Sequence, residues 1–102
     1  MKLLAFSMFD TAAGYYDRPL VCRSEAEAKR MLVDIVQEGS HQIAKHPDCF
    51  TLMHVGVWDD NTGHFDPIAP TKVMTALEAQ SVVNNQGTRS LPDLPDNYGG
   101  TD

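Results

Sequence analysis

The sequence has no long hydrophobic run and few basic residues. No apolar stretch approaches the roughly 18 residues that a membrane-spanning helix needs, so we expect no role in a membrane. Eight Lys and Arg stand against 14 Asp and Glu in 102 residues, which gives a formal net charge of −6. Because cation–phosphate contacts supply most nonspecific affinity for DNA and RNA, this balance disfavours tight nonspecific binding, and any nucleic-acid contact has to be local.

Cysteine is scarce as well, with Cys22 and Cys49 the two thiols. The opening Met-Lys-Leu-Leu-Ala-Phe-Ser has too short an apolar run for a signal peptide and is typical of a first strand. Without an export signal, the expected compartment is the cytoplasm. Because that compartment is reducing, both cysteines are expected to be free thiols.

Motifs for catalysis or metal binding are missing. The four His and two Cys lack the paired close spacing of zinc sites. The acids Asp59, Asp60 and Asp66 fall where a hairpin turn needs small polar residues, and Gly63 is misplaced for a calcium loop. Cys49 lies near histidines, but no third group is identifiable that would orient a base. The sequence therefore predicts a protein that is not an enzyme and needs no cofactor or metal.

The length allows one domain near the lower end of the usual range. Residues 84–102 are mostly Asn, Gln, Gly, Thr, Ser, Pro and Asp, a composition that cannot bury a core. We therefore predict a single domain over residues 1–83 and a flexible polar tail over residues 84–102. Because a core of this size is only marginal, a homodimer or higher homo-oligomer is expected to cover further apolar surface.

One helix has clear start and stop signals. Ser24-Glu25-Ala26-Glu27 is a capping box, in which a hydroxyl and a carboxylate satisfy the first unpaired amides of a helix. Gly39 is placed to end the helix in a left-handed conformation, and Glu25 can pair with Lys29. These signals predict a helix over about residues 24–39. Its apolar side consists of Ala28, Met31, Leu32, Ile35 and Val36.

The strands follow from shorter patterns. Leu3–Phe9 is apolar and predicts a first strand, and Cys49–Trp58 predicts a second with both faces largely covered. Period-two alternation divides this second strand into two faces. One face would carry Phe50, Leu52, His54, Gly56 and Trp58, and the other Thr51, Met53, Val55 and Val57.

A hairpin and a second helix are expected to follow. The polar turn Asp59–Gly63 should reverse the chain into a short strand over His64–Ile68. Two prolines, Pro67 and Pro70, should shorten that strand, and Thr71–Ser81 should form a short second helix. The fold class is α+β, a small antiparallel sheet of three or four strands with one main helix packed on it and a second short helix.

The segment His46–Phe65 resembles a region of the small non-structural proteins of gokushoviruses, phages of the Microviridae. In both, a His-Pro dipeptide precedes an aromatic-Thr-Leu strand, followed by Gly, an acidic turn and Thr-Gly. The likeness extends over roughly residues 1–79. It implies a phage protein of the host bacterial cytoplasm that is accessory to viral single-stranded DNA synthesis. Such proteins are commonly named as non-structural or DNA-synthesis proteins.

Aromatic and basic residues are the candidates for a nucleic-acid site. Aromatic side chains on a sheet can stack with single-stranded bases, whereas core or dimer packing explains most aromatics in a small domain. Basic side chains nearby would contact phosphates. The candidate residues for nucleic-acid binding are Tyr15, Tyr16, Arg18, Arg23, Lys45 and Lys72.

Two functions stay open. The first is a replication accessory that binds single-stranded DNA or a phage or host replication protein. The second is a non-enzymatic protein-interaction or regulatory module acting on a host or phage protein. The net charge of −6 favours the second, as does the tail segment Leu91–Pro95, which could fold on a partner.

Overall fold

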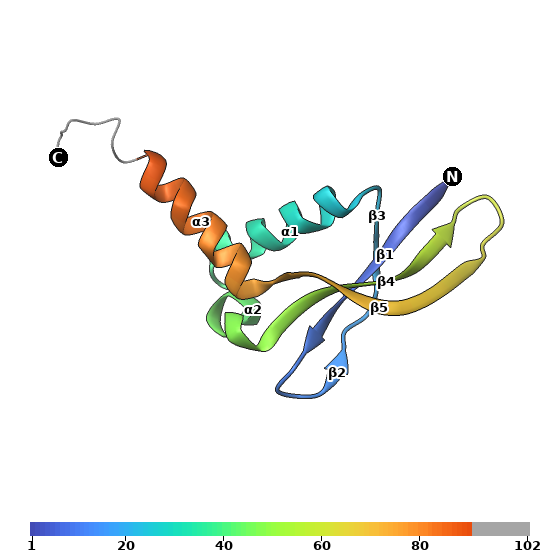
Figure 1. Ribbon diagram of the computed structural model, residues 1–102, viewed down its shortest axis with the longest axis horizontal. Helices are drawn as coiled ribbons and strands as arrows, with labels where there is room; N and C mark the ends of the chain where they lie inside the picture. The colour runs from blue at the N-terminus through green and yellow to red at the C-terminus, as the bar shows by residue number, and fades with distance from the viewer. Residues whose placement is uncertain (91–102) are drawn as a thin grey trace.

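A five-stranded antiparallel sheet with helices packed against it forms the protein (Figure 1), so the expected α+β class is confirmed. The computed structural model describes the backbone of residues 1–90 and the side chains of residues 1–85. The strands are β1 (Lys2–Asp10), β2 (Tyr15–Tyr16), β3 (Leu20–Cys22), β4 (Phe50–Asp59) and β5 (Phe65–Thr75). The helices are α1 (Glu25–Glu38), α2 (Gln42–Lys45), the 3-10 helix η1 (Pro47–Cys49) and α3 (Ala76–Ser90).

The strands follow the order β2-β1-β4-β5, and β3 pairs with β1 along the same edge as β2. β1 therefore lies inside the sheet, with β4 on one side and the two short strands on the other. The hairpin β4–β5 places β5 at the opposite edge. This arrangement leaves the outer edge of β5 without a partner strand among the described residues.

Helix α1 begins and ends as its sequence predicts. The Ser24 hydroxyl accepts a hydrogen bond from the Glu27 amide at 3.1 Å. The Glu27 carboxylate accepts from the Arg23 amide at 2.7 Å, one residue earlier than in a standard capping box. At the other end, Gly39 has φ 87°, a conformation that costs glycine little. The helix is therefore bounded by local sequence signals.

The hydrophobic core lies between one face of the sheet and the helices. Its largest fully buried side chains are Phe6 of β1, Leu32 of α1 and Leu52 of β4. From α3, Ala76 and Ala79 reach the same cluster, which allows the close approach of α1 and α3 seen in Figure 1. The other buried members are Cys22, Ala28, Val36 and Ile43.

Strand β5 and helix α3 differ from the sequence prediction. The strand continues to Thr75 instead of ending near Ile68, and the helix begins at Ala76 and runs to Ser90. Both prolines fit because β5 is an edge strand and residues 68–70 bulge opposite Val55. The helix start uses a second capping box, in which Thr75 Oγ1 accepts from the Glu78 amide at 3.0 Å and Glu78 Oε1 accepts from the Thr75 amide at 2.8 Å.

The helix α3 also includes residues 84–90, which the sequence analysis assigned to a polar tail. The predicted tail beyond them, residues 91–102, lies outside the described residues. Two short helical segments, α2 and η1, occupy the polar stretch between α1 and β4, for which no element was predicted. His41 caps α2 by accepting a hydrogen bond from the Ile43 amide at Nδ1.

The predicted faces of β4 are right only as far as His54. Phe6 pairs with His54 and Ala5 pairs with Gly56, so Val55 is an extra residue opposite no partner on β1. Such a bulge reverses the alternation beyond it. Val57 therefore lies on the helix-side face, and Gly56 and Trp58 lie on the other face.

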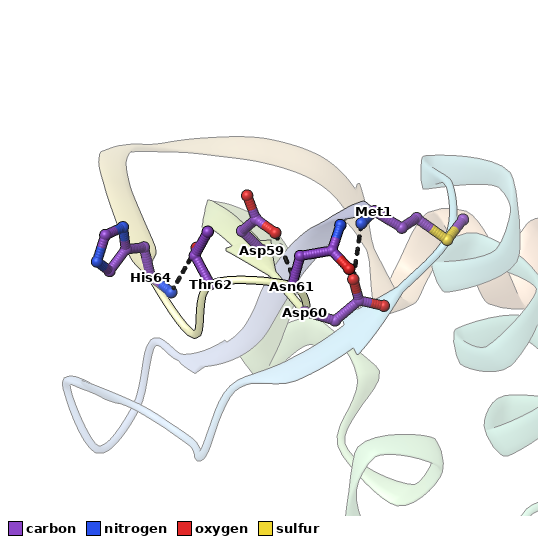
Figure 2. A network of polar contacts seen from close by, with 6 residues as sticks. All are labelled: Met1, Asp59, Asp60, Asn61, Thr62 and His64. Atoms are coloured by element: carbon purple, nitrogen blue, oxygen red, sulfur yellow. Dashed lines mark hydrogen bonds and ion pairs between the residues drawn. The ribbon is translucent and has the colours of Figure 1, made fainter.

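The β4–β5 turn has the predicted polar chemistry (Figure 2). The Asp59 carboxylate accepts from the Asn61 amide at 2.9 Å, and Thr62 Oγ1 accepts from the His64 amide at 3.2 Å. Gly63 takes φ 77°, as a reversal at this point requires. The Met1 ammonium contacts the Asp60 carboxylate at 2.7 Å, which joins the start of β1 to this turn.

Candidate functional site

The sheet face turned away from the helices is the first candidate surface, here called the open face. Strand pairing identifies the residues of the open face, because residues directly opposite one another on paired strands point to the same side of the sheet. From β1 and its edge strands come Leu3, Ala5, Ser7, Phe9, Tyr16 and Val21. From β4 and β5 come Thr51, Met53, Gly56, Trp58, Phe65, Pro67, Lys72 and Thr75.

Aromatic side chains border a row of small residues on the open face. Ala5, Ser7 and Gly56 form the row, while Tyr16 and Phe65 are each 43% exposed. Tyr16 packs against Phe9 with ring centroids 4.6 Å apart. The open face therefore presents ring surfaces that are held in place by the sheet.

Gly56 has to be glycine for this arrangement. A Cβ atom at this position would lie 2.8 Å from the carbonyl oxygen of Asp66 and closer still to the ring of Phe65. The Phe65 ring thus rests directly on the Gly56 backbone. This contact fixes one exposed aromatic side chain over the middle of the sheet.

Charge is divided unequally between the two faces. Among the residues assigned to the open face, Lys72 is the one charged side chain. The strand carboxylates Asp10, Asp59 and Asp66 pair with residues of the opposite face. Although the chain carries a net charge of −6, the strand residues assigned to the open face include no carboxylate, and Glu78 of α3 pairs with Lys72 at its border. A polyanion approaching it would meet less repulsion than the overall charge indicates.

The second candidate surface is a groove on the helix side, between α1, α2 and the β1–β2 hairpin. It consists of three adjoining hollows of about 140, 150 and 510 Å³. His41 lines all three, so the hollows meet at this side chain. We call this surface the groove.

The groove has an apolar floor and an acidic rim. Its rim carboxylates are Asp10, Asp17, Asp34 and Glu38, with Arg18 the cation that also lines it. Hydrogen bonds from the Ser40 hydroxyl and amide lower the pKa of Glu38, so this carboxylate stays charged at neutral pH.

The six predicted site residues do not form one patch. Tyr16 and Lys72 belong to the open face, although β1 and β4 separate their strands, which places them at least roughly 14 Å apart. Tyr15 and Arg18 line the groove instead. Arg23 precedes α1 and Lys45 ends α2, and the Lys72 ammonium pairs with Glu78 at 3.2 Å.

Two aromatic members of the open face had weaker signals in the sequence. Phe9 ends the first apolar run and reads as an ordinary strand residue. Trp58 was placed on the same face as Phe50 and Leu52, because the bulge at Val55 leaves no mark in a period-two pattern. The signal that could have indicated the open face is Gly56, since a glycine inside a strand often marks a bulge or a close contact.

Neither cysteine is arranged for nucleophilic chemistry. Burial, followed by the charge of Glu27, raises the pKa of the Cys22 thiol. Burial and the neighbouring Asp48 raise the pKa of the Cys49 thiol. Both are free thiols, as predicted, and both favour the protonated form, which is the weaker nucleophile.

Residues 1–90 contain neither a cluster of metal ligands nor a membrane-spanning helix. This part of the chain contains no group of three His, Cys, Asp or Glu side chains that could hold a metal ion. In the same residues, none of the helices combines the length and apolar character needed to cross a membrane.

Comparison with known proteins gives one match. The family model described as Phage ORF5 protein matches residues 3–79. No curated protein and no solved structure matches the chain. The match agrees with the expected phage origin, while the assignment to gokushoviruses and the link to DNA synthesis stay predictions. Because the match covers well over half of the sequence, the chain belongs to the Phage ORF5 protein family.

Proposed function

We propose that this phage protein is a non-enzymatic accessory to viral single-stranded DNA synthesis and that it binds single-stranded DNA on the open face. The observation that carries the proposal is the segregation of side chains across the sheet. The residues assigned to the open face include no carboxylate, and they carry an exposed aromatic ring at each end, Tyr16 beside Phe9 and Phe65 beside Trp58.

Base stacking supplies the physical basis. Aromatic side chains on an open sheet stack with unpaired bases, and each stacked base contributes about 1–3 kcal/mol. Tyr16 and Phe65 are exposed, and each has a contact that holds it: the Tyr16 ring packs beside the Phe9 ring, and the Phe65 ring rests on Gly56. Because Lys72, the one cation assigned to the open face, already pairs with Glu78, we expect affinity to come mainly from stacking and to depend weakly on salt.

The role in DNA synthesis draws on two further supports. The chain belongs to a phage protein family, and its sequence resembles the non-structural proteins of gokushoviruses, whose genomes are single-stranded DNA. A protein that covers unpaired bases suits a replication cycle that produces single strands. The protein would act by binding and not by chemistry on the DNA.

Adjacent tyrosines provide a matched pair of variants. Tyr16 lies on the open face, whereas Tyr15 pairs with Asp10 and lines the groove. Fluorescence anisotropy with labelled oligothymidine would measure the affinity of Tyr16→Ala, Phe65→Ala and Tyr15→Ala proteins. We expect each open-face variant to weaken binding by about tenfold or more, because a stacked base is lost. Tyr15→Ala should bind like the unmodified protein.

Two outcomes would contradict the proposal. One is the absence of binding at low salt; the other is an equal loss of affinity in the Tyr15→Ala and Tyr16→Ala proteins. A homodimer, expected from the small core, would compete for the same face. Size-exclusion chromatography with light scattering, with and without oligothymidine, would show whether a second copy occupies it.

A further inference from the structure

The groove is separate from the open face, and the proposed binding of DNA does not use it. It lies on the helix side, where Tyr15 and Arg18 were expected to contact nucleic acid. Its rim carries four carboxylates, so phosphate groups would be repelled there. An occupant of different chemistry is required.

The middle hollow is suited to an apolar side chain. It measures about 150 Å³ and is lined by Met8, Leu20, Met31, Ile35 and Ile43, among others. An apolar cavity of about 150 Å³ holds a group as large as benzene. A single Phe or Leu side chain would therefore fit as an anchor.

The two flanking hollows are suited to positive charge. Asp10 and Asp17 line the hollow on one side of the anchor position, and Asp34 and Glu38 line the hollow on the other. The exposed Asp34 side chain has no hydrogen bond or ion pair with the residues that the structure describes, so its carboxylate is available to a cation of a partner.

His41 adds a directional contact at the centre. Its Nδ1 accepts the Ile43 amide at 3.0 Å, which places the proton of the neutral ring on Nε2. That N–H can donate to a backbone carbonyl of a chain lying in the groove. The groove thus offers an apolar pocket, two acidic flanks and one donor.

We propose that the groove binds a segment of a partner protein that carries one large apolar side chain flanked on both sides by Lys or Arg. Charge complementarity selects this occupant over the chain's own last residues, since residues 91–102 contain three aspartates and no Lys or Arg. Charge complementarity also selects this segment over single-stranded DNA, whose phosphates the acidic rim would repel. The protein would then hold two ligands at once, on opposite faces of one sheet.

Short fluorescein-labelled peptides test the proposal by anisotropy with the full chain. The probe has a central Phe between lysines and serines; one matched peptide replaces Phe with Ser, and another replaces each Lys with Glu. We expect binding of the first peptide and a loss of binding in both matched peptides. The double variant Asp17→Asn/Asp34→Asn should weaken the first peptide roughly fivefold, because each exposed charge contact contributes about 0.5 kcal/mol.

The control variant is Asp66→Asn, which removes the same kind of charge from exposed β5, outside the groove. It should leave peptide affinity unchanged. Equal binding of the Lys and Glu peptides, or an equal effect of Asp66→Asn and the double variant, would overturn the proposal. Tyr16→Ala should not alter peptide binding, so this result is independent of whether DNA binds the open face.

Discussion

The open face and the groove lie on opposite sides of one sheet and differ in nearly every property. The open face carries aromatic side chains and no carboxylate among its strand residues, whereas the groove is concave, aliphatic at its floor and acidic at its rim. Both properties arise from alternate residues on the same strands: Tyr15 and Tyr16 are neighbours that reach different surfaces. An average such as net charge therefore hides two surfaces of different chemistry.

Side chains on the helix side of the sheet are expected to contribute most of the free energy of unfolding. A truncation in the core tests this most strongly. Leu32 of α1 is 1% exposed, so Leu32→Ala should lower the free energy of unfolding by about 2–5 kcal/mol. Phe65→Ala on the open face should cost about 1 kcal/mol, since this ring is already 43% exposed. Urea denaturation measures both. Equal losses would mean that the open face also holds the fold together.

The next largest effect is expected at Gly56. Gly56→Ala places a methyl group against the Phe65 ring and a backbone carbonyl, and should destabilise the protein by about 1–3 kcal/mol. Thermal unfolding would measure the loss. Removing the ring as well, in Gly56→Ala/Phe65→Ala, should recover part of the stability. Strict additivity of the two changes would show that the ring does not rest on this glycine.

A smaller effect is expected where β5 meets α3. Thr75→Ala removes the hydroxyl that accepts the Glu78 amide, which should cost about 1 kcal/mol. Thr71→Ala, a change of the same size on exposed β5, serves as the control and should be nearly neutral. Urea titration distinguishes them. Thr71 pairs with His54 on the other face, so Thr71→Ala should also leave binding of oligothymidine unchanged.

Acidification should have the smallest effect, and one contribution to it lies on the groove side. The pKa of Glu38 is lowered from its ordinary value of 4.5 by hydrogen bonds from Ser40. A carboxyl whose folded pKa is depressed stabilises the protein above its unfolded pKa, and that contribution is lost as pH falls through the folded value. The unfolding midpoint should therefore decline as the pH falls below the ordinary pKa of 4.5. Glu38→Gln should make this decline shallower, and an unchanged slope would exclude a role for Glu38.

Local signals predicted the parts of the fold that depend on neighbouring residues. The cap at Ser24, the left-handed Gly39 and the hairpin turn at Gly63 all appear where the sequence places them. Each of these features requires only a few consecutive residues and no information about the rest of the chain. For this reason α1 and the hairpin could be predicted.

Other parts depended on pairing that sequence alone does not contain. Pro67 and Pro70 normally end a strand, but β5 tolerates them because it is an edge strand with a bulge. The bulge at Val55 reversed the faces of Gly56 and Trp58, and with them the composition of the open face. The Thr75–Glu78 capping box was present in the sequence, but the prolines had suggested an earlier helix start.

The prolines of β5 have a consequence for how the protein behaves at high concentration. An exposed strand edge with regular amides can recruit the edge of a neighbouring molecule and start aggregation. Pro67 and Pro70 carry no amide hydrogen, and the bulge between them interrupts the remaining ladder. Edge-to-edge association through β5 is thereby disfavoured, so crowding of many copies need not extend the sheet from one molecule to the next.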